Sequence, residues 1–291
     1  MEKVLIIGGS GLMGSALVGL FPNAYFTFNR TEMNIPNSFK LDISEQQALE
    51  LLLGKVRPET VIVTAAMTGV DMCELDPEMA YRINALPFYT IVKYLSKLGG
   101  RIIQVSTDYV FSGEAGRYRE YDKREPINVY GKSKMKAEDI IIDSGIYYTI
   151  IRTSGIFGAR ESSGKVNFFL WVYRSLLNGK EISIVKDQYY SPTLNTNLAE
   201  AISEIYDNGT DGVLHFSSID RISRYDFALR IADAFALKSD LIRPVSMNEI
   251  GWTAKRPRDS SLSVEKSATL LKKKPLKVEE EIILAKRQMS R

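Results

Sequence analysis

Cysteine and histidine are almost absent from this chain of 291 residues, which contains one of each. The single cysteine, Cys73, excludes a disulfide within the chain and is typical of a reducing compartment. Zinc sites are built mainly from several Cys and His ligands, so we expect no metal site. A nucleophilic triad would have to rely on His215 alone. We interpret Cys73 as a structural residue.

A strong charge of one sign and a long apolar run are also lacking. The 38 Lys and Arg residues against 35 Asp and Glu residues leave a net charge of +3, and the basic residues are spread along the chain. We therefore expect no nucleic-acid partner. No stretch approaches the roughly 18 apolar residues of a membrane span, and glycines interrupt the apolar opening run, unlike a signal peptide. These features predict a cytoplasmic protein without membrane association.

The first half of the chain alternates short apolar runs with longer segments of helical period. Strands are expected at 3–8, 24–29, 59–66, 100–107 and 147–154, and helices at 11–21, 44–55, 76–99 and 129–143. Strand, helix, strand at this rhythm predicts a parallel sheet, and wholly apolar strands are typical of a sheet covered on both faces. We interpret residues 1–154 as a Rossmann-type, doubly wound α/β domain that binds a nucleotide.

Two local signals refine these helices. Pro87 lies inside the expected helix at 76–99 and should kink or split it. Ser44, followed by Gln47 three residues later, predicts a capping box at the start of the helix at 44–55.

Beyond residue 155 the alternation is less regular. Helices are expected at 167–179, 196–209 and 223–237, strands at 181–185 and 212–218, and a loop leading to a helix at 256–266. We expect residues 155–291 to form mainly a smaller C-terminal substrate-binding lobe, with part of 186–211 packing on the first domain.

Three glycines follow the first expected strand in the segment GGSGLMG. Between a strand and a helix, Gly8 permits a tight turn, Gly11 lets the backbone approach a pyrophosphate, and Gly14 permits close packing of the helix on the strand. The spacing predicts a dinucleotide site. Its candidate ligands are Gly8, Ser10, Gly11, Leu12, Met13 and Gly14.

The end of the second strand bears on the choice of cofactor. An NAD site usually carries an acidic residue there for the ribose 2′-hydroxyl, whereas Asn29 and Arg30 hold that position in FNRTE. An arginine can pair with a 2′-phosphate and stack on the adenine. We therefore favour NADP(H) over NAD(H), while the nearby Glu32 keeps NAD(H) open.

Two Tyr–Lys pairs share the spacing that places both side chains on one face of a helix. Tyr89 and Lys93 have apolar neighbours, and we interpret them as packing. Tyr130 and Lys134 begin a helix that follows the polar segment 106–109, at the carboxyl end of an apolar strand. Ligands bind at that edge of open α/β sheets, so we predict Tyr130 and Lys134 as the reaction centre.

A set of motifs occurs in a fixed order between residues 8 and 262: GGSGLMG, VSTDYVFSG, EPINVYGKSKMKAE, RTSGIFG, DQYYSPT and RPRDSSL. With them the chain resembles the extended short-chain dehydrogenase/reductases, and most closely the dTDP-4-dehydrorhamnose reductase family. The resemblance implies reduction of a sugar ketone in a nucleotide-sugar substrate. In that scheme Tyr130 donates the proton, Lys134 lowers the pKa of Tyr130 and holds the nicotinamide ribose, and Thr107 orients the carbonyl oxygen.

The resemblance also implies two sets of contacts, beyond the glycine segment. The cofactor set contains Asn29, Arg30, Asp42, Ile43, Ala65, Ala66, Thr68, Tyr130 and Lys134. The substrate set contains Thr68, Val70, Thr107, Asp108, Tyr109, Tyr130, Asn167 and Arg256.

One departure from the family and three alternatives remain. The family usually has Trp after RTS as a contact on the sugar, whereas Gly155 stands here and removes a flat surface from the pocket. A dehydratase is disfavoured because Asp108 is followed by Tyr109 rather than Glu. An epimerase stays open, as does a non-catalytic protein resembling the NADP-binding regulatory subunit of methionine adenosyltransferase. The candidate assemblies are a homodimer and, under the last alternative, a complex with that enzyme.

Overall fold

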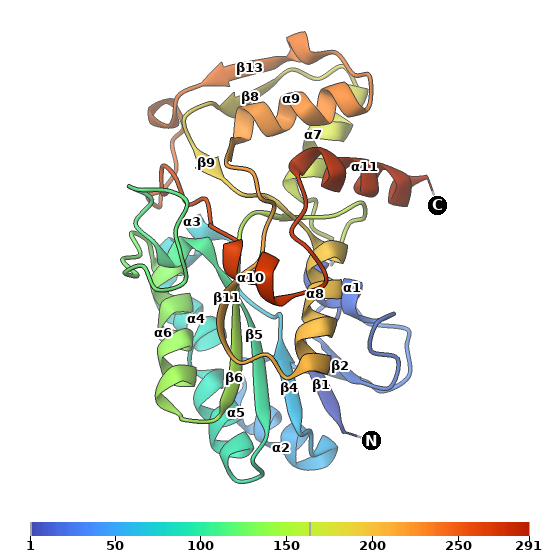
Figure 1. The fold of residues 1–291 in the computed structure, drawn as a ribbon, viewed down its shortest axis with the longest axis vertical. Helices are drawn as coiled ribbons and strands as arrows, with labels where there is room; N and C mark the ends of the chain where they lie inside the picture. Colours follow the sequence, from blue (N-terminus) through green and yellow to red (C-terminus); the bar gives the residue numbers. More distant parts are fainter. Residues whose placement is uncertain (1, 163, 291) are drawn as a thin grey trace.

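A parallel sheet forms the centre of the protein, in a computed structural model that describes residues 2–162 and 164–290 (Figure 1). Its seven strands lie in the order β11-β6-β5-β4-β1-β2-β3, and every pairing is parallel. The strands are β1 (Val4–Ile7), β2 (Tyr25–Phe28), β3 (Ser38–Lys40), β4 (Thr60–Val63), β5 (Arg101–Thr107), β6 (Tyr147–Thr153) and β11 (Gly212–His215). The order reverses between β4 and β1, so the predicted doubly wound fold is confirmed.

Helices cover both faces of this sheet, as the wholly apolar strands require. On one face, residues of β1 pack with α2 (Gln46–Val56), α5 (Pro87–Ser96) and α6 (Val129–Asp143). On the other face, β1 packs with α1 (Leu12–Leu17) and α8 (Asn195–Asn208). The sheet is therefore buried between two apolar layers, and its carboxyl edge is where ligands bind in such folds.

The second half of the chain contributes to this domain as well as forming a layer of its own. β11 pairs with β6 at the edge of the sheet, and α8 packs beside α1. Figure 1 shows the remaining elements gathered at the opposite end of the molecule from the N-terminus. These elements are α7 (Phe168–Leu177), α9 (Arg224–Ala234), α11 (Val278–Met289), β8 (Ile182–Val185) and β13 (Ile242–Val245), and they share a separate apolar core.

Short elements connect the two layers. Three small strand pairs are formed by β7 (Ile156–Phe157) with β10 (Thr193–Leu194), β9 (Tyr189–Tyr190) with β12 (Ile222–Ser223), and β8 with β13. The remaining helical segments are α3 (Val70–Leu75), α4 (Pro77–Asn84), α10 (Glu265–Leu270), η1 (Asp108–Val110), η2 (Ser239–Leu241) and η3 (Met247–Glu249). The sequence patterns did not predict α3, α11, β3 or β13.

Three local expectations can be compared with the structure. Pro87 splits its segment as predicted, because α4 ends at Asn84 and α5 begins at Pro87. The capping box at Ser44 is wrong: the Ser44 hydroxyl donates to Asp42, and α2 begins two residues later without a side-chain cap. Tyr89 is half exposed, so its pair with Lys93 lies on the solvent face rather than in the core.

Within the described ranges, every helix is too short or too polar to cross a membrane.

Candidate active site

The glycine loop between β1 and α1 is held against neighbouring backbone. Gly8 has a φ of +98°, and a Cβ there would lie 2.6 Å from the amide nitrogen of Ala65. A Cβ on Gly14 would lie 2.1 Å from the carbonyl oxygen of Gly8. A Cβ on Gly11 would approach only that oxygen, at 3.2 Å, so the outer side of Gly11 is open to a ligand. This cradle fits the pyrophosphate of a dinucleotide.

The other residues of the loop tie it to the second half of the chain. The carbonyl oxygen of Ser10 accepts a hydrogen bond from the Ser162 hydroxyl at 2.6 Å. The carbonyl oxygen of Leu12 accepts one from the Asn195 amide at 2.9 Å, and the side chain of Met13 is buried. Segments distant in sequence therefore hold the loop in its shape.

The ends of β2 and β3 meet where the adenine is expected. The Asn29 side-chain amide donates to the Asp42 carboxylate at 3.2 Å. Burial raises the pKa of Asp42, but the hydrogen bonds from Ser44 and Asn29 outweigh it and leave the pKa below its usual value. Arg30 is exposed, and no carboxylate of the described residues lies within 4 Å of its guanidinium. A free cation and an acid therefore stand at the same edge.

The segment after β4 is fixed by one buried amide. Asn84, 1% exposed on α4, accepts a hydrogen bond from the Met67 backbone amide at 2.8 Å and donates to the Met67 carbonyl oxygen at 3.1 Å. The same side chain donates to Ser133 of α6 at 3.0 Å. Asn84 thereby joins the strand end that carries Ala65, Ala66 and Thr68 to the helix that carries Tyr130. Ile43 is buried in the apolar core on the α2 side of the sheet.

The strand end at β5 presents a buried carboxyl in a cage of hydroxyls. Asp108, 3% exposed, accepts hydrogen bonds from Ser154 at 2.6 Å, from Thr107 at 3.0 Å and from Ser260. Burial raises the pKa of Asp108, and the three hydroxyls act against that rise. Because Ser154 follows β6 and Ser260 belongs to the C-terminal half, the cage also joins the two layers at this edge.

The start of α6 closes against this strand end. Asn128 caps the helix by accepting a hydrogen bond from the Gly131 amide at 2.8 Å. A Cβ on Gly131 would lie 2.1 Å from the Tyr109 carbonyl oxygen, so glycine is required for this close approach. The rings of Tyr109 and Tyr130 meet edge to face, with 5.9 Å between their centroids. The predicted site residues of β5 and α6 are therefore brought together.

Tyr130 holds its proton firmly. Burial raises the pKa of its phenol above the usual value, hydrogen bonding with Thr107 lowers it in part, and the charge of Asp108 raises it again. The Lys134 ammonium donates to the Val105 carbonyl oxygen at 2.9 Å, and burial lowers the pKa of Lys134 to about 8. The pKa of Tyr130 therefore lies above its usual value, whereas a lowered pKa was expected from the sequence.

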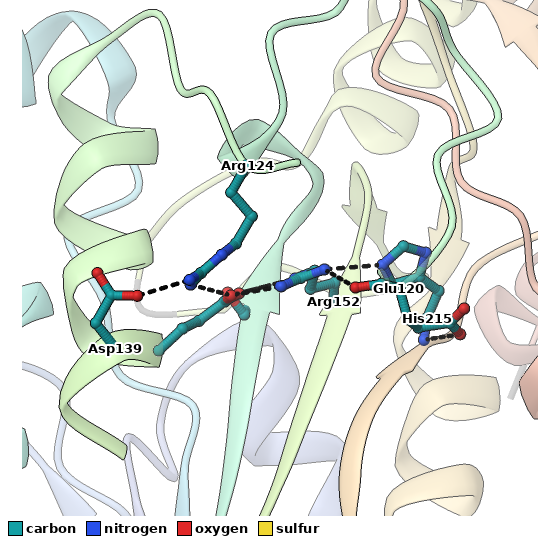
Figure 2. Close-up of polar contacts among 7 residues, drawn as sticks. Glu120, Arg124, Asp139, Arg152 and His215 are labelled. Carbon is teal, nitrogen blue, oxygen red and sulfur yellow. Dashed lines mark hydrogen bonds and ion pairs between the residues drawn. The ribbon is translucent and has the colours of Figure 1, made fainter. Parts of the chain in front are cut away.

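A buried ion-pair network lies beneath this centre (Figure 2). Arg152, 2% exposed, donates to the Glu138 carboxylate through Nη2 at 2.7 Å and through Nε at 3.1 Å. Arg124 approaches from the other side and bonds Glu138 at 3.1 Å and Asp139 at 2.7 Å, while Ser106 donates to Glu138 at 2.5 Å. Three side chains thus fix one carboxylate.

This network reaches the reaction centre through α6. Glu138 lies one helical turn after Lys134, and its negative charge raises the pKa of that lysine against the effect of burial. On the far side, Arg152 lies 3.4 Å from the ring of His215, which is fully buried. Burial, and then the charge of Arg152, lower the pKa of His215 to about 3. The only histidine is therefore neutral and structural.

Two residues of the expected substrate set have partners within the protein. Arg256 forms an ion pair with Asp71 at 2.7 Å, one residue beyond Val70, and its guanidinium lies 5.2 Å from the Trp252 ring centroid. Asn167 caps α7 by accepting a hydrogen bond from the Leu170 amide at 3.3 Å. Arg256 lies beside the start of α3, next to Val70 of the same set. Asn167 caps α7, the helix that it precedes.

Several positioning residues escaped the sequence reasoning, although signals for some existed. Ser154 and Ser260 lie inside the quoted motifs RTSGIFG and RPRDSSL, and Glu138 follows Lys134 at helical spacing. Asn84 carried no such signal, because its partners at Met67 and Ser133 are distant in sequence. Cys73 is buried, and its thiol donates to the Met67 carbonyl oxygen, as a structural cysteine would.

A parallel doubly wound sheet, a glycine cradle, and a Thr, Tyr and Lys set at the carboxyl edge define the class, an extended short-chain dehydrogenase/reductase. The profile of the RmlD substrate-binding domain matches residues 1–289. The chain belongs to this family.

Relatives of this chain are similar over most of their length. The spore coat polysaccharide biosynthesis protein SpsK of Bacillus subtilis is 32% identical over 90% of this chain and 89% of its own length. The dTDP-4-dehydrorhamnose reductase of Aggregatibacter actinomycetemcomitans is 31% identical over 91% of this chain and 92% of its own. The methionine adenosyltransferase 2 subunit beta of Rattus norvegicus is 26% identical over 92% of this chain and 82% of its own.

Solved structures are similar to this chain in fold over almost its whole length. A hypothetical dTDP-4-dehydrorhamnose reductase from Sulfolobus tokodaii has a TM-score of 0.85 and 38% identity, covering 94% of this chain and 95% of that one. The dTDP-4-dehydrorhamnose reductase of Bacillus anthracis, in complex with NADP, has a TM-score of 0.85 and 29% identity, covering 99% of each chain.

Proposed function

We propose that the protein reduces the 4-keto group of a nucleotide-activated deoxysugar with NADPH, as in dTDP-rhamnose biosynthesis. The observation that carries the proposal is the junction of β5 and α6. There Thr107, Tyr130 and Lys134 stand beside Asp108 and Tyr109, at the sheet edge that also holds the glycine cradle. The similarity to dTDP-4-dehydrorhamnose reductases over most of the chain supports the same reaction.

Each of the three residues has a distinct task in this proposal. Bound NADPH supplies the hydride. Tyr130, which burial keeps protonated, gives its proton to the oxygen of the reduced ketone. The Lys134 ammonium favours the resulting tyrosinate, because a nearby positive charge stabilises a phenolate. The Thr107 hydroxyl, which donates to Asp108 in this structure, turns to orient the carbonyl oxygen of the sugar.

NADP(H) is the favoured cofactor because of Arg30. Its exposed guanidinium suits a 2′-phosphate, whereas the nearby acid Asp42 is hydrogen-bonded to Asn29 and Ser44. We expect Arg30→Ala to weaken NADPH binding, measured by nucleotide fluorescence, and to leave NADH binding unchanged. Equal losses for both nucleotides would refute this role of Arg30.

The test of the reaction is NADPH oxidation with a nucleotide-linked 4-keto-6-deoxyhexose. Tyr130→Phe should lower kcat by about 10²- to 10⁴-fold, the usual contribution of general acid catalysis, and leave NADPH binding intact. Tyr89→Phe is the matched control, since Tyr89 has the same spacing to a lysine but lies half exposed on α5. If Tyr130→Phe turns over as fast as wild type, the proposed proton donor is wrong.

A regulatory role is the second candidate, because methionine adenosyltransferase subunits are among the relatives. In that case the chain would bind NADP and associate with the synthetase without reducing a sugar. Co-purification with methionine adenosyltransferase, together with no oxidation of NADPH by any keto sugar, would favour this role. Light scattering of the purified chain distinguishes a monomer from the candidate homodimer.

A further inference from the structure

Gly155 lies against an aromatic ring that comes from elsewhere in the chain. Its φ of +47° is a conformation that side chains rarely adopt, and a Cβ there would lie 2.4 Å from Cε2 of Tyr190. The ring of Tyr190, on β9, therefore occupies the space that a side chain at position 155 would need. A tryptophan at position 155 would therefore collide with this ring.

The Tyr190 hydroxyl is a buried polar group that has no hydrogen-bond partner among the described residues. Its side chain is 3% exposed, and its phenol interacts electrostatically with Arg224, Tyr109 and Asp108. Two of these neighbours belong to the strand end that borders Tyr130. A buried hydroxyl without a partner is costly and uncommon, so its position at this edge points to a ligand that supplies one.

Arg224, the first residue of α9, lies over the same ring. Its guanidinium carbon is 4.7 Å from the Tyr190 ring centroid, and Nε donates to the Gln188 side-chain oxygen at 2.7 Å. The amide of Gln188 in turn lies 3.3 Å from the Tyr109 hydroxyl. Arg224 is therefore linked to the substrate end of the site through Gln188.

The charge of Arg224 is not neutralised by an ion pair. Arg221 and Arg230, on either side of it in the sequence, pair with Asp259 and Glu279, whereas no carboxylate in residues 2–162 and 164–290 lies within 4 Å of the Arg224 guanidinium. An arginine has five N–H donors; Gln188 accepts from one of them, and the Tyr109 side chain is a second hydrogen-bond partner. Donors remain for an acceptor outside the protein.

We propose that Tyr190 and Arg224 bind the hexose of the nucleotide-sugar substrate and select it by its oxygen substituents. The Tyr190 hydroxyl and the Arg224 N–H groups hydrogen-bond these oxygens, while the buried Tyr190 ring holds the hydroxyl in place. The inference deepens the proposed function and rests on it. The acceptor oxygens belong either to hydroxyls or to a carboxylate at C6, and both would engage an arginine in the same way.

The experiment compares two substrates, a nucleotide-linked 4-keto-6-deoxyhexose and the corresponding 4-ketohexuronate, in NADPH oxidation. Tyr190→Phe should raise KM about 3- to 10-fold, and Arg224→Gln about 10- to 100-fold, as expected for loss of a neutral and a charged hydrogen bond. The dissociation constant of NADPH should not change. A larger effect of Arg224→Gln on the hexuronate identifies a carboxylate as the ligand, and equal effects identify hydroxyls.

Two neighbouring residues provide matched controls. Tyr189 precedes Tyr190 on β9, but its ring packs under Arg221, with 3.8 Å between the guanidinium carbon and the ring centroid. Successive side chains of a strand point to opposite faces, so Tyr189→Phe should leave KM unchanged. Arg230→Gln alters an exposed, ion-paired arginine of the same helix and should also leave KM unchanged.

Stability separates a ligand role from a structural one. Tyr190→Phe removes an unpartnered hydroxyl, so the melting temperature should stay the same or rise while KM for the sugar increases. KM values within twofold of wild type for both variants, or a KM increase accompanied by a loss of stability, would overturn the inference. If the wild-type protein reduces neither sugar, the proposed function is wrong, and so is the inference that rests on it.

Discussion

Replacing Glu138 with Gln tests whether the buried network supports both the fold and the reaction centre. The substitution keeps the shape of the side chain and removes its charge. Arg152, 2% exposed, would then be a buried cation without its carboxylate. Breaking a buried pair by removing one partner costs about 3–5 kcal/mol of unfolding free energy. For a chain of this size, whose unfolding entropy is about 0.6 kcal/mol/K, that corresponds to a melting temperature lower by roughly 5–8 °C.

The same substitution should alter the pH dependence of catalysis. Burial lowers the pKa of Lys134, and the charge of Glu138 raises it in part. The two effects together give a pKa of about 8. Without that charge the pKa of Lys134 falls further, so the lysine loses its proton at a lower pH. The alkaline limb of the profile of kcat/KM against pH, which reports groups of the free enzyme, should therefore move to lower pH.

The assays are urea denaturation and steady-state NADPH oxidation. The second is run from roughly pH 6 to pH 9, a range that includes the pKa of Lys134. Asp139→Asn is the matched control, because Asp139 pairs with Arg124 in the same network but its side chain is 33% exposed. That variant should cost less than about 1 kcal/mol and leave the alkaline limb in place. If Glu138→Gln is no less stable than Asp139→Asn and its alkaline limb does not move, the network has neither of the assigned roles.

Two further predictions concern stability. His215 has a pKa of about 3 in the folded protein and about 6.5 when unfolded, so the unfolded state binds its proton first as the pH falls. The free energy of unfolding should therefore fall below pH 6.5, by about 2 kcal/mol between pH 7 and pH 5. In urea denaturation, His215→Gln should show a smaller dependence of this free energy on pH over the same range. An unchanged dependence on pH would contradict the assignment. Gly14→Ala should lower the free energy of unfolding by about 1–3 kcal/mol and weaken NADPH binding, because its Cβ would lie 2.1 Å from the Gly8 carbonyl oxygen. Gly54→Ala is the control: no atom lies within 4 Å of its Cβ, so calorimetry should show a neutral or stabilising effect. Similar melting temperatures for the two glycine variants would show that the loop can relax.

Local patterns were sufficient to predict the sheet and the cofactor end. The apolar runs predicted β1, β2, β4, β5 and β6, because a residue buried on both faces of a sheet must be apolar whatever its distant partners are. Gly8 and Gly14 could be assigned to the turn because the steric limits on a strand–turn–helix junction act within a few residues. Pro87 ended one helix and began another for the same short-range reason.

Two local predictions failed because the structure gave the residue a partner or an exposure that its pattern did not indicate. Ser44 looked like a helix cap, but Asp42 takes its hydroxyl. Tyr89 looked buried among apolar neighbours, but its face of α5 is turned to solvent. Periodicity shows that a helix has an apolar face, and tertiary packing decides which residues at its border are covered.

The sequence by itself therefore determined the doubly wound fold, the glycine loop and the Tyr130–Lys134 pair, because each depends on spacing along one strand or helix. Only the tertiary structure placed Ser154 and Ser260 around Asp108, and the Tyr190 ring beside Gly155. Those contacts join segments far apart in the chain, and nothing in the local pattern of either segment specifies its partner. In the proposed function, the reaction type rests on residues set by short-range order, and the choice of sugar rests on contacts between the two layers.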